Sequence, residues 1–139
     1  MKKTKLLNAP LSQLIAQMGH TDGLTICDAG LPIPTTTYNI DLAVTKDIPR
    51  FLDVFETTVA ELFVERVLLA EEIQKINPSV HLAILEKLTL LEKQQGNQIQ
   101  VDYVPHEQFK QQANLSKGIV RSGECSPYAN IILYSGVPF

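Results

Sequence analysis

The most informative stretch of the sequence covers residues 24–34 and reads LTICDAGLPIP. A short apolar run that is bounded by glycine and proline is typical of a buried strand. Asp28 then lies at the carboxyl end of that strand, and the loop behind it is comparatively stiff because proline fixes its own backbone φ angle. The stretch therefore predicts a carboxylate presented at the edge of a sheet.

The flanking segments alternate between the patterns of helices and strands. A helix is expected to begin at Asn8 and Pro10, to continue with apolar residues at helical spacing, and to end at Gly19. Further helices are expected from about Pro49 through Phe55, between Asn77 as N-cap and Gly96, and after Pro105. Further strands are expected at residues 40–44, 98–104, 118–121 and 131–134.

Residues 62–73 fit two patterns. The β-branched and apolar side chains of residues 63–69 favour a buried strand, whereas residues 70–73 suit a helix, and we favour the strand. Helices and strands then alternate along the chain without internal repeats, which predicts one α/β domain over residues 1–139. The expected architecture is a three-layer α/β/α, Rossmann-like domain with a mixed, mostly parallel sheet of about six strands.

The composition is that of a chain with a substantial core. Of 139 residues, 45% are hydrophobic and 19% are charged, which is ordinary for one compact domain. The formal net charge of −3 gives little attraction for nucleic acid or for anionic membranes. The apolar runs are short, so we expect neither a signal peptide nor a membrane-spanning helix, which needs roughly 20 apolar residues. We therefore expect a cytoplasmic protein.

Several polar side chains fall at the ends of expected strands, where ligands bind in open α/β sheets. His106 and Lys110 are spaced to project from one face of a helix, a pattern that an ordinary solvated face also produces. His20 follows an expected helix end, where an imidazole either caps the last carbonyls or acts in a site. Asp28 is either a loop-capping carboxylate or a site residue. The full candidate set is His20, Asp28, His106, Lys110, Tyr128 and Asn130.

Other kinds of site have little support in the sequence. The zinc patterns H-E-x-x-H and C-x-x-C are absent, as are both glycine-rich phosphate-binding motifs, so we expect no metal and no nucleotide. Cys27 and Cys125 form no redox motif, no local signature supports cysteine catalysis, and we expect Cys27 to lie in the core. Arg121 and Glu124 are expected to form an ion pair or loop hydrogen bonds rather than to act as catalysts.

Four motifs resemble those of the ribose pyranase and fucose mutarotase family. They are MGHTD at residues 18–22, DAGLPIP at residues 28–34, HEQFK at residues 106–110 and RSGECSPYAN at residues 121–130. The resemblance extends to the closing GVPF at residues 136–139 and covers essentially the whole chain. Four motifs in this order are highly specific together.

The resemblance implies a layered α/β domain that assembles into a ring-like homodecamer, with sites near subunit boundaries and with no metal or cofactor. It implies a catalytic role for His20 and a sugar-binding role for Asp28, His106, Lys110, Tyr128 and Asn130. The implied substrate is free D-ribose, which is converted from β-D-ribopyranose to β-D-ribofuranose. The alternatives are an L-fucose type anomer mutarotase and a non-catalytic sugar-binding accessory protein of ribose uptake.

The implied chemistry suits these residue types. Opening a cyclic hemiacetal needs one proton delivered to the ring oxygen and one removed from the anomeric hydroxyl, and a histidine, with an ordinary pKa of roughly 6.5, can do either near neutrality. We take His20 as the donor, and the acceptor is one of the other site residues or a water. The apolar residues 137–139 are expected to pack on their own domain or, as the resemblance favours, against a neighbouring subunit.

Overall fold

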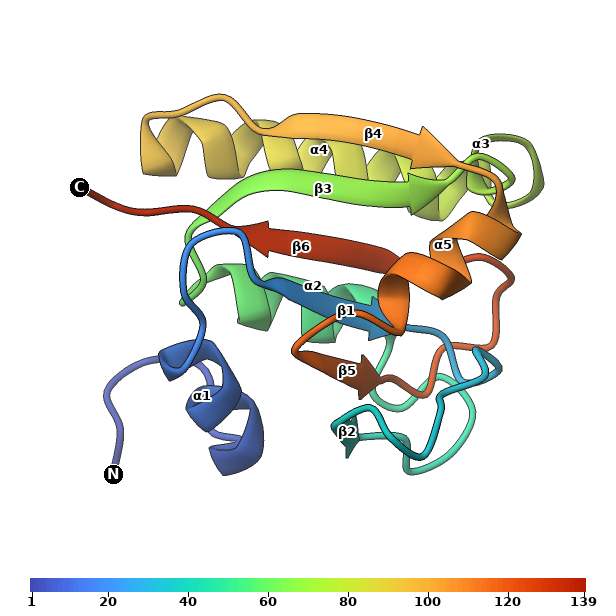
Figure 1. Cartoon of the computed structure of the whole chain (residues 1–139), viewed down its shortest axis with the longest axis horizontal. Coiled ribbons are helices and arrows are strands. Elements are labelled where there is room, and N and C mark those ends of the chain that lie inside the picture. Colours follow the sequence, from blue (N-terminus) through green and yellow to red (C-terminus); the bar gives the residue numbers. More distant parts are fainter.

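The computed structural model describes residues 1–139 and contains a six-stranded sheet with helices on both faces (Figure 1). The strands are β1 (Gly23–Cys27), β2 (Asn39–Asp41), β3 (Val64–Ala70), β4 (Gln100–Val104), β5 (Gly118–Arg121) and β6 (Ile131–Ser135). The helices are α1 (Ala9–Ala16), α2 (Phe51–Val59), α3 (Ile73–Ile76), α4 (Pro78–Gln95) and α5 (His106–Ala113). The strand that we favoured within residues 62–73 is confirmed as β3.

The strand order in the sheet is β2-β5-β1-β6-β3-β4. β6 is antiparallel to β1 and to β3, and the other pairings, β1 with β5, β2 with β5 and β3 with β4, are parallel. The predicted mixed, mostly parallel sheet is confirmed. Because β6 runs opposite to its neighbours, it begins at the edge where the parallel strands end, and it ends where they begin.

The sheet is buried on both faces. On one face, a core of 22 buried residues joins the strands to α1, α2 and α4, and it includes Leu24 and Ile26 of β1. On the other face, a core of 8 buried residues includes Cys27 of β1 and Phe109 of α5. Strands that are covered on both sides are buried at consecutive positions, as β1 and β6 largely are. The predicted three layers are confirmed.

The first helix begins where the sequence predicts and ends earlier. Asn8 Oδ1 accepts a hydrogen bond from the Leu11 N–H at 2.9 Å, which caps the start of α1. The helix ends at Ala16, so the expected stop at Gly19 is wrong. Gly19 lies instead in a following turn, where its N–H donates to Asp22 Oδ2 at 2.8 Å.

The long helix α4 ends at Gly96, as predicted. The φ angle of Gly96 is +73°, a left-handed conformation that glycine adopts without a steric penalty. At the other end, Asn77 precedes the helix but its side chain does not cap it. No helix in the chain has both the length and the apolar character needed to cross a membrane.

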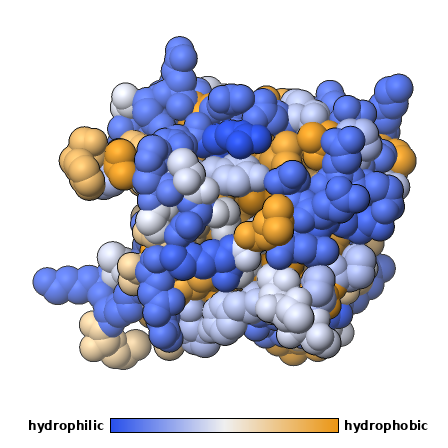
Figure 2. Space-filling view, in the orientation of Figure 1, coloured by the Kyte–Doolittle hydropathy of each residue, from blue (hydrophilic) through white to orange (hydrophobic).

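The C-terminal tail leaves the body of the molecule. Residues 137–139 follow β6 and are exposed, and Phe139 reaches 101% of its reference exposure. Figure 1 shows the C-terminus extending away from the sheet, and Figure 2 shows an apolar protrusion at the same place. Phe139 therefore does not pack on its own domain.

Gly123, in the loop after β5, gives a prediction for stability. A Cβ atom at this position would lie 2.6 Å from the Thr45 carbonyl oxygen and would also collide with the Ile48 backbone. Backbone atoms cannot swing away as a side chain can, so Gly123→Ala should lower the free energy of unfolding by about 1–3 kcal/mol, measured by denaturant unfolding. Gly30→Ala is the control, since its Cβ would meet nothing closer than 3.5 Å. Equal losses of unfolding free energy in the two variants would contradict the predicted steric clash at position 123.

Candidate functional site

Four of the six candidate residues gather at the edge where the parallel strands end. Asp28 follows β1 directly, and His106 is the first residue of α5 after β4. Tyr128 and Asn130 lie in the loop that leads into β6, which begins beside the last residues of β1 and β3. We call these four residues the carboxyl-edge cluster.

Asp28 and Asn130 are joined by reciprocal hydrogen bonds. The Asp28 backbone N–H donates to Asn130 Oδ1 at 2.9 Å, and Asn130 Nδ2 donates to Asp28 Oδ2 at 2.9 Å. The other carboxylate oxygen, Oδ1, accepts from the Gly30 N–H at 2.9 Å, so Asp28 also caps its loop. Asn130 is fully buried whereas Asp28 is half-buried. A buried amide thus fixes a carboxylate that still reaches solvent.

The His106 ring contacts two other aromatic rings. It meets Tyr128 edge-on, with centroids 5.0 Å apart, and it lies nearly parallel to Phe109 at 6.3 Å. The His106 Nδ1 atom is buried and has no hydrogen-bond partner. Buried polar atoms are nearly always partnered, and leaving one unpartnered costs about 1–3 kcal/mol. A polar ligand that hydrogen-bonds to Nδ1 would remove this cost.

The loop that carries Tyr128 is fixed in an uncommon conformation. The φ angle of Tyr128 is +58°, in the left-handed region that a bulky residue rarely adopts. Asn77 Nδ2 holds the loop by donating to Ser126 Oγ and to the Pro127 carbonyl, both at 2.9 Å. These bonds explain why Asn77 does not cap α4. Strain of this kind persists only where the surroundings determine the backbone, and it occurs often at functional sites.

Two glutamates outside the candidate set, Glu72 and Glu124, support the cluster. Both Glu72 carboxylate oxygens lie 3.1 Å from the His106 backbone N, and the negative charge favours this helix N-terminus. Glu124 accepts from the Phe51 N–H at 3.2 Å and from Ser126 Oγ at 2.7 Å. The rule that led to Asp28 could have found Glu72, because Glu72 closely follows the carboxyl end of β3.

Lys110 lies one helical turn after His106 on α5. Its Nζ atom forms an ion pair with Glu107 Oε1 at 2.7 Å, and this hydrogen bond lowers the pKa of the Glu107 carboxyl. Glu107 is largely exposed, and exposed ion pairs hold their partners weakly. Lys110 can therefore exchange Glu107 for another polar group, although in this structure its Nζ atom forms no hydrogen bond with the carboxyl-edge cluster.

A hollow of about 400 Å³ opens beside Asp28. Its walls are two loops, residues 28–30 and residues 124–127. The volume lies within the range of roughly 300–1,000 Å³ that is usual for small-molecule sites. Asp28 is the only candidate residue that lines it.

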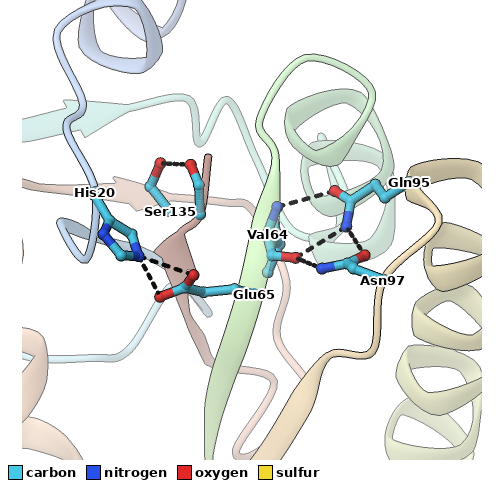
Figure 3. A network of polar contacts seen from close by, with 7 residues as sticks. His20, Val64, Glu65, Gln95, Asn97 and Ser135 are labelled. Carbon is cyan, nitrogen blue, oxygen red and sulfur yellow. Dashed lines mark hydrogen bonds and ion pairs between the residues drawn. The ribbon is translucent and has the colours of Figure 1, made fainter. Parts of the chain in front are cut away.

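His20 lies at the opposite edge of the sheet. It precedes β1, and a five-residue strand such as β1 spans roughly 16 Å. His20 does not cap the carbonyls of α1, so that alternative is wrong. Its Nε2 atom lies 3.0 Å from both carboxylate oxygens of Glu65, as Figure 3 shows. A single copy of the chain therefore does not bring His20 to the carboxyl-edge cluster.

Cys27 and Arg121, the other ionisable groups that the sequence analysis weighed near the cluster, have structural roles. Burial raises the pKa of the Cys27 thiol far above its ordinary value, so the thiol stays protonated and is not a nucleophile. Arg121 pairs with Asp41 at 2.9 Å and donates to the Ala29 carbonyl at 3.0 Å. The expected ion pair between Arg121 and Glu124 is wrong, whereas the alternative of loop hydrogen bonds is confirmed. No three His, Cys, Asp or Glu side chains are grouped so that they could hold a metal ion.

The chain matches the RbsD / FucU transport protein family over residues 1–138. It is 63% identical to the D-ribose pyranase of Pasteurella multocida and 60% identical to that of Glaesserella parasuis, in each case over the full length of both chains. Among solved structures, Bacillus subtilis RbsD complexed with D-ribose matches with a TM-score of 0.88 and 38% identity over all of both chains. The fucose mutarotase of Streptococcus pneumoniae, in complex with L-fucose, matches with a TM-score of 0.74 over 99% of both chains; at 23% identity this likeness concerns the fold alone.

The bonds between Asp28 and Asn130 predict a coupled loss of stability. Asn130→Ala leaves the Asp28 N–H and one carboxylate oxygen without partners, so the free energy of unfolding should fall by about 1–3 kcal/mol. In a double-mutant cycle with Asp28→Ala, measured by denaturant unfolding, the two losses should deviate from additivity by at least about 0.5 kcal/mol. Asn97→Ala is the control, because Asn97 bonds only to Gln95 and Val64 and should add independently. Additive losses for Asp28 and Asn130 would rule out the coupling.

Proposed function

The chain belongs to the RbsD / FucU transport protein family, and we propose that it is a D-ribose pyranase, an isomerase that interconverts β-D-ribopyranose and β-D-ribofuranose in the cytoplasm. The observation that carries this proposal is the 63% identity, over the whole of both chains, with a protein of that name. The product would supply the furanose form of ribose for catabolism.

The proposed reaction consists of proton transfers and one carbon–oxygen bond exchange. His20 gives a proton to the ring oxygen as the bond between C1 and that oxygen breaks, and the anomeric hydroxyl loses its proton to an acceptor in the site. The open-chain aldehyde rotates, and a different hydroxyl attacks C1 to close the ring of the other size. No electron leaves or enters the sugar, so side-chain acid–base groups are sufficient.

The carboxyl-edge cluster supports the binding of a small polyol. The Asp28 carboxylate, which Asn130 holds in place, can accept hydrogen bonds from sugar hydroxyls. His106 Nδ1 has no protein partner and can bond to another hydroxyl. The Tyr128 ring adds an apolar face with a polar tip. We assign Lys110 a further contact at the edge of the site, where it would leave Glu107 for the sugar.

The separation of His20 from this cluster supports a site made by two copies of the chain. The two sets of residues lie at opposite edges of one sheet, and loop motions do not span the length of a buried strand. A second copy could place its own His20 beside the first copy's cluster. The exposed apolar tail, with Phe139 at its end, supports such an assembly because it provides a surface for a neighbouring subunit. A ring-like decamer is the arrangement we propose.

Exchange measurements on ribose test this function. Saturation-transfer NMR should show faster conversion between the pyranose and furanose signals when the protein is present. His20→Ala should slow this exchange about 100-fold or more, because the proton donor is lost, while light scattering shows an unchanged assembly. Near-normal exchange in that variant would refute the role of His20.

The same measurement separates the two rival functions. L-fucose is tested in parallel, and faster α/β exchange of fucose without faster ribose exchange would indicate an anomer mutarotase. Ribose binding without any acceleration of exchange would indicate a non-catalytic sugar-binding protein. Either result would contradict the proposal.

Mixed assemblies test whether the site is shared between copies. His20→Ala and Asp28→Ala should each be inactive, but a 1:1 mixture refolded together should regain activity. With random mixing, about one quarter of the sites would receive an intact histidine from one copy and an intact aspartate from the other. Separately folded and then combined variants are the control. A refolded mixture that stays inactive, although light scattering shows mixed assemblies, would place both residues in one subunit.

A further inference from the structure

Glu65 of strand β3 faces the His20 ring (Figure 3), although β6 lies between β3 and β1, the strand that follows His20. His20 Nε2 lies 3.0 Å from each carboxylate oxygen of Glu65, so one N–H is shared between the two oxygens. The His20 side chain is 54% exposed and that of Glu65 is 37% exposed. No protein atom bonds to the other ring nitrogen, Nδ1. The carboxylate therefore engages one specific nitrogen of the imidazole.

A β-bulge presents Glu65 to the histidine. β3 and β6 pair between Val64 and Ser135 and again between Arg66 and Tyr134, so two steps along β3 correspond to one step along β6. Glu65 is the extra residue. Bulges redirect side chains and occur often beside active sites. The direction of the Glu65 side chain thus depends on an irregularity in the sheet.

Neighbouring residues hold this bulge in place. The Gln95 side chain accepts from the Val64 N–H and donates to the Val64 carbonyl, both at 2.9 Å, and Asn97 Nδ2 adds a third bond at 3.0 Å (Figure 3). Directly after β6, Gly136 leaves space for the Glu65 side chain, because a Cβ atom there would lie 3.0 Å from Glu65 Cβ and 3.1 Å from Glu65 Oε2.

The segment that carries the histidine is fixed as well. The Thr21 N–H donates to the Ser135 carbonyl at 2.8 Å, and Thr21 has a φ angle of +68°. Asp22 Oδ2 accepts from the Gly19 N–H at 2.8 Å and from Lys117 Nζ at 2.7 Å. The lysine hydrogen bond lowers the pKa of the Asp22 carboxyl. The carboxylate that holds this turn is therefore ionised at neutral pH. Both partners of the contact are therefore positioned by their backbones.

We propose that Glu65 is a positioning residue for His20, an inference that rests on the ring-opening activity proposed above. By accepting the Nε2–H, the carboxylate fixes the tautomer in which Nδ1 faces the sugar. On ring opening, Nδ1–H of the imidazolium passes its proton to the ring oxygen, and the neutral ring keeps its Nε2–H on Glu65. On closure, the attacking hydroxyl returns a proton to Nδ1, and the acceptor in the site returns its proton to the aldehyde oxygen, which becomes the new anomeric hydroxyl.

The ring nitrogens of His20 give a direct test that does not depend on activity. In ¹⁵N NMR spectra at a pH where the ring is neutral, Nε2 should carry the proton and Nδ1 should not. Glu65→Ala should mix the two tautomers. Glu65→Gln should preserve the tautomer, because its side-chain oxygen still accepts from Nε2–H. Glu56→Ala is the control, since Glu56 is a partly exposed carboxylate that pairs with Lys87 instead.

Kinetics test the consequence for proton transfer. In the assembled protein, Glu65→Ala should lower kcat for ribose exchange at least about tenfold and leave KM within about twofold, because the sugar-holding residues are untouched. Glu65→Gln should fall between that variant and the unmodified protein. Gly136→Ala should also lower kcat, since its methyl group would crowd the Glu65 side chain that holds His20.

An unchanged kcat in Glu65→Ala or in Glu65→Gln, whichever variant assembles normally, would overturn the inference. A Glu65→Ala variant in which His20 keeps the same tautomer as in the unmodified protein would overturn it as well. Failure of the proposed function looks different. In that case the unmodified protein would not accelerate ribose exchange, and the ¹⁵N spectra would still show whether Glu65 sets the tautomer of His20.

Discussion

Strand β6 hydrogen-bonds to β1 on one side and to β3 on the other, and no other pairing joins the two halves of the sheet. Without it, β2, β5 and β1 would share no strand contact with β3 and β4. Residues 131–133 are fully buried, and they alternate between the two cores. A shift of one residue would move each side chain to the other face, so the packing of these residues fixes the register of the whole sheet.

The two ends of β6 also hold the segments that carry the carboxyl-edge cluster and His20. Asn130, immediately before the strand, bonds to Asp28 at the carboxyl edge. Ser135, its last residue, accepts from the N–H of Thr21 beside His20, and its own N–H donates to the Asp22 carbonyl. The distance between the carboxyl-edge cluster and the proposed proton donor is thus set by the length of a buried strand. That length does not change without unfolding the core, which is the physical reason why the proposed site would need another copy of the chain.

Much of this arrangement follows from local sequence signals. Asn8 caps its own helix, and the apolar run before Asp28 predicts both a buried strand and a carboxylate at its end. The failures involve residues whose partners are distant in the sequence. Asn77 has the side chain of an N-cap but bonds to the loop at residues 126–127. Glu65 reaches His20 through a bulge, which arises from the pairing of two strands and has no signature in the residues of either strand alone.

The two edges differ in how their side chains are held, and the difference fits their proposed tasks. At the carboxyl edge, the left-handed backbone of Tyr128 and the unpartnered Nδ1 of His106 each cost on the order of 1–3 kcal/mol. The stability of the core sustains both costs. A bound sugar would offset the cost at His106 by hydrogen-bonding to Nδ1. The proposed sugar-binding residues are thus preorganised in the unliganded protein. At the other edge, His20 is half exposed and needs only its orientation to be fixed, because its part in the proposed reaction is to pass one proton to the sugar and to take one back. A single carboxylate, Glu65, is enough to fix that orientation without burying the ring.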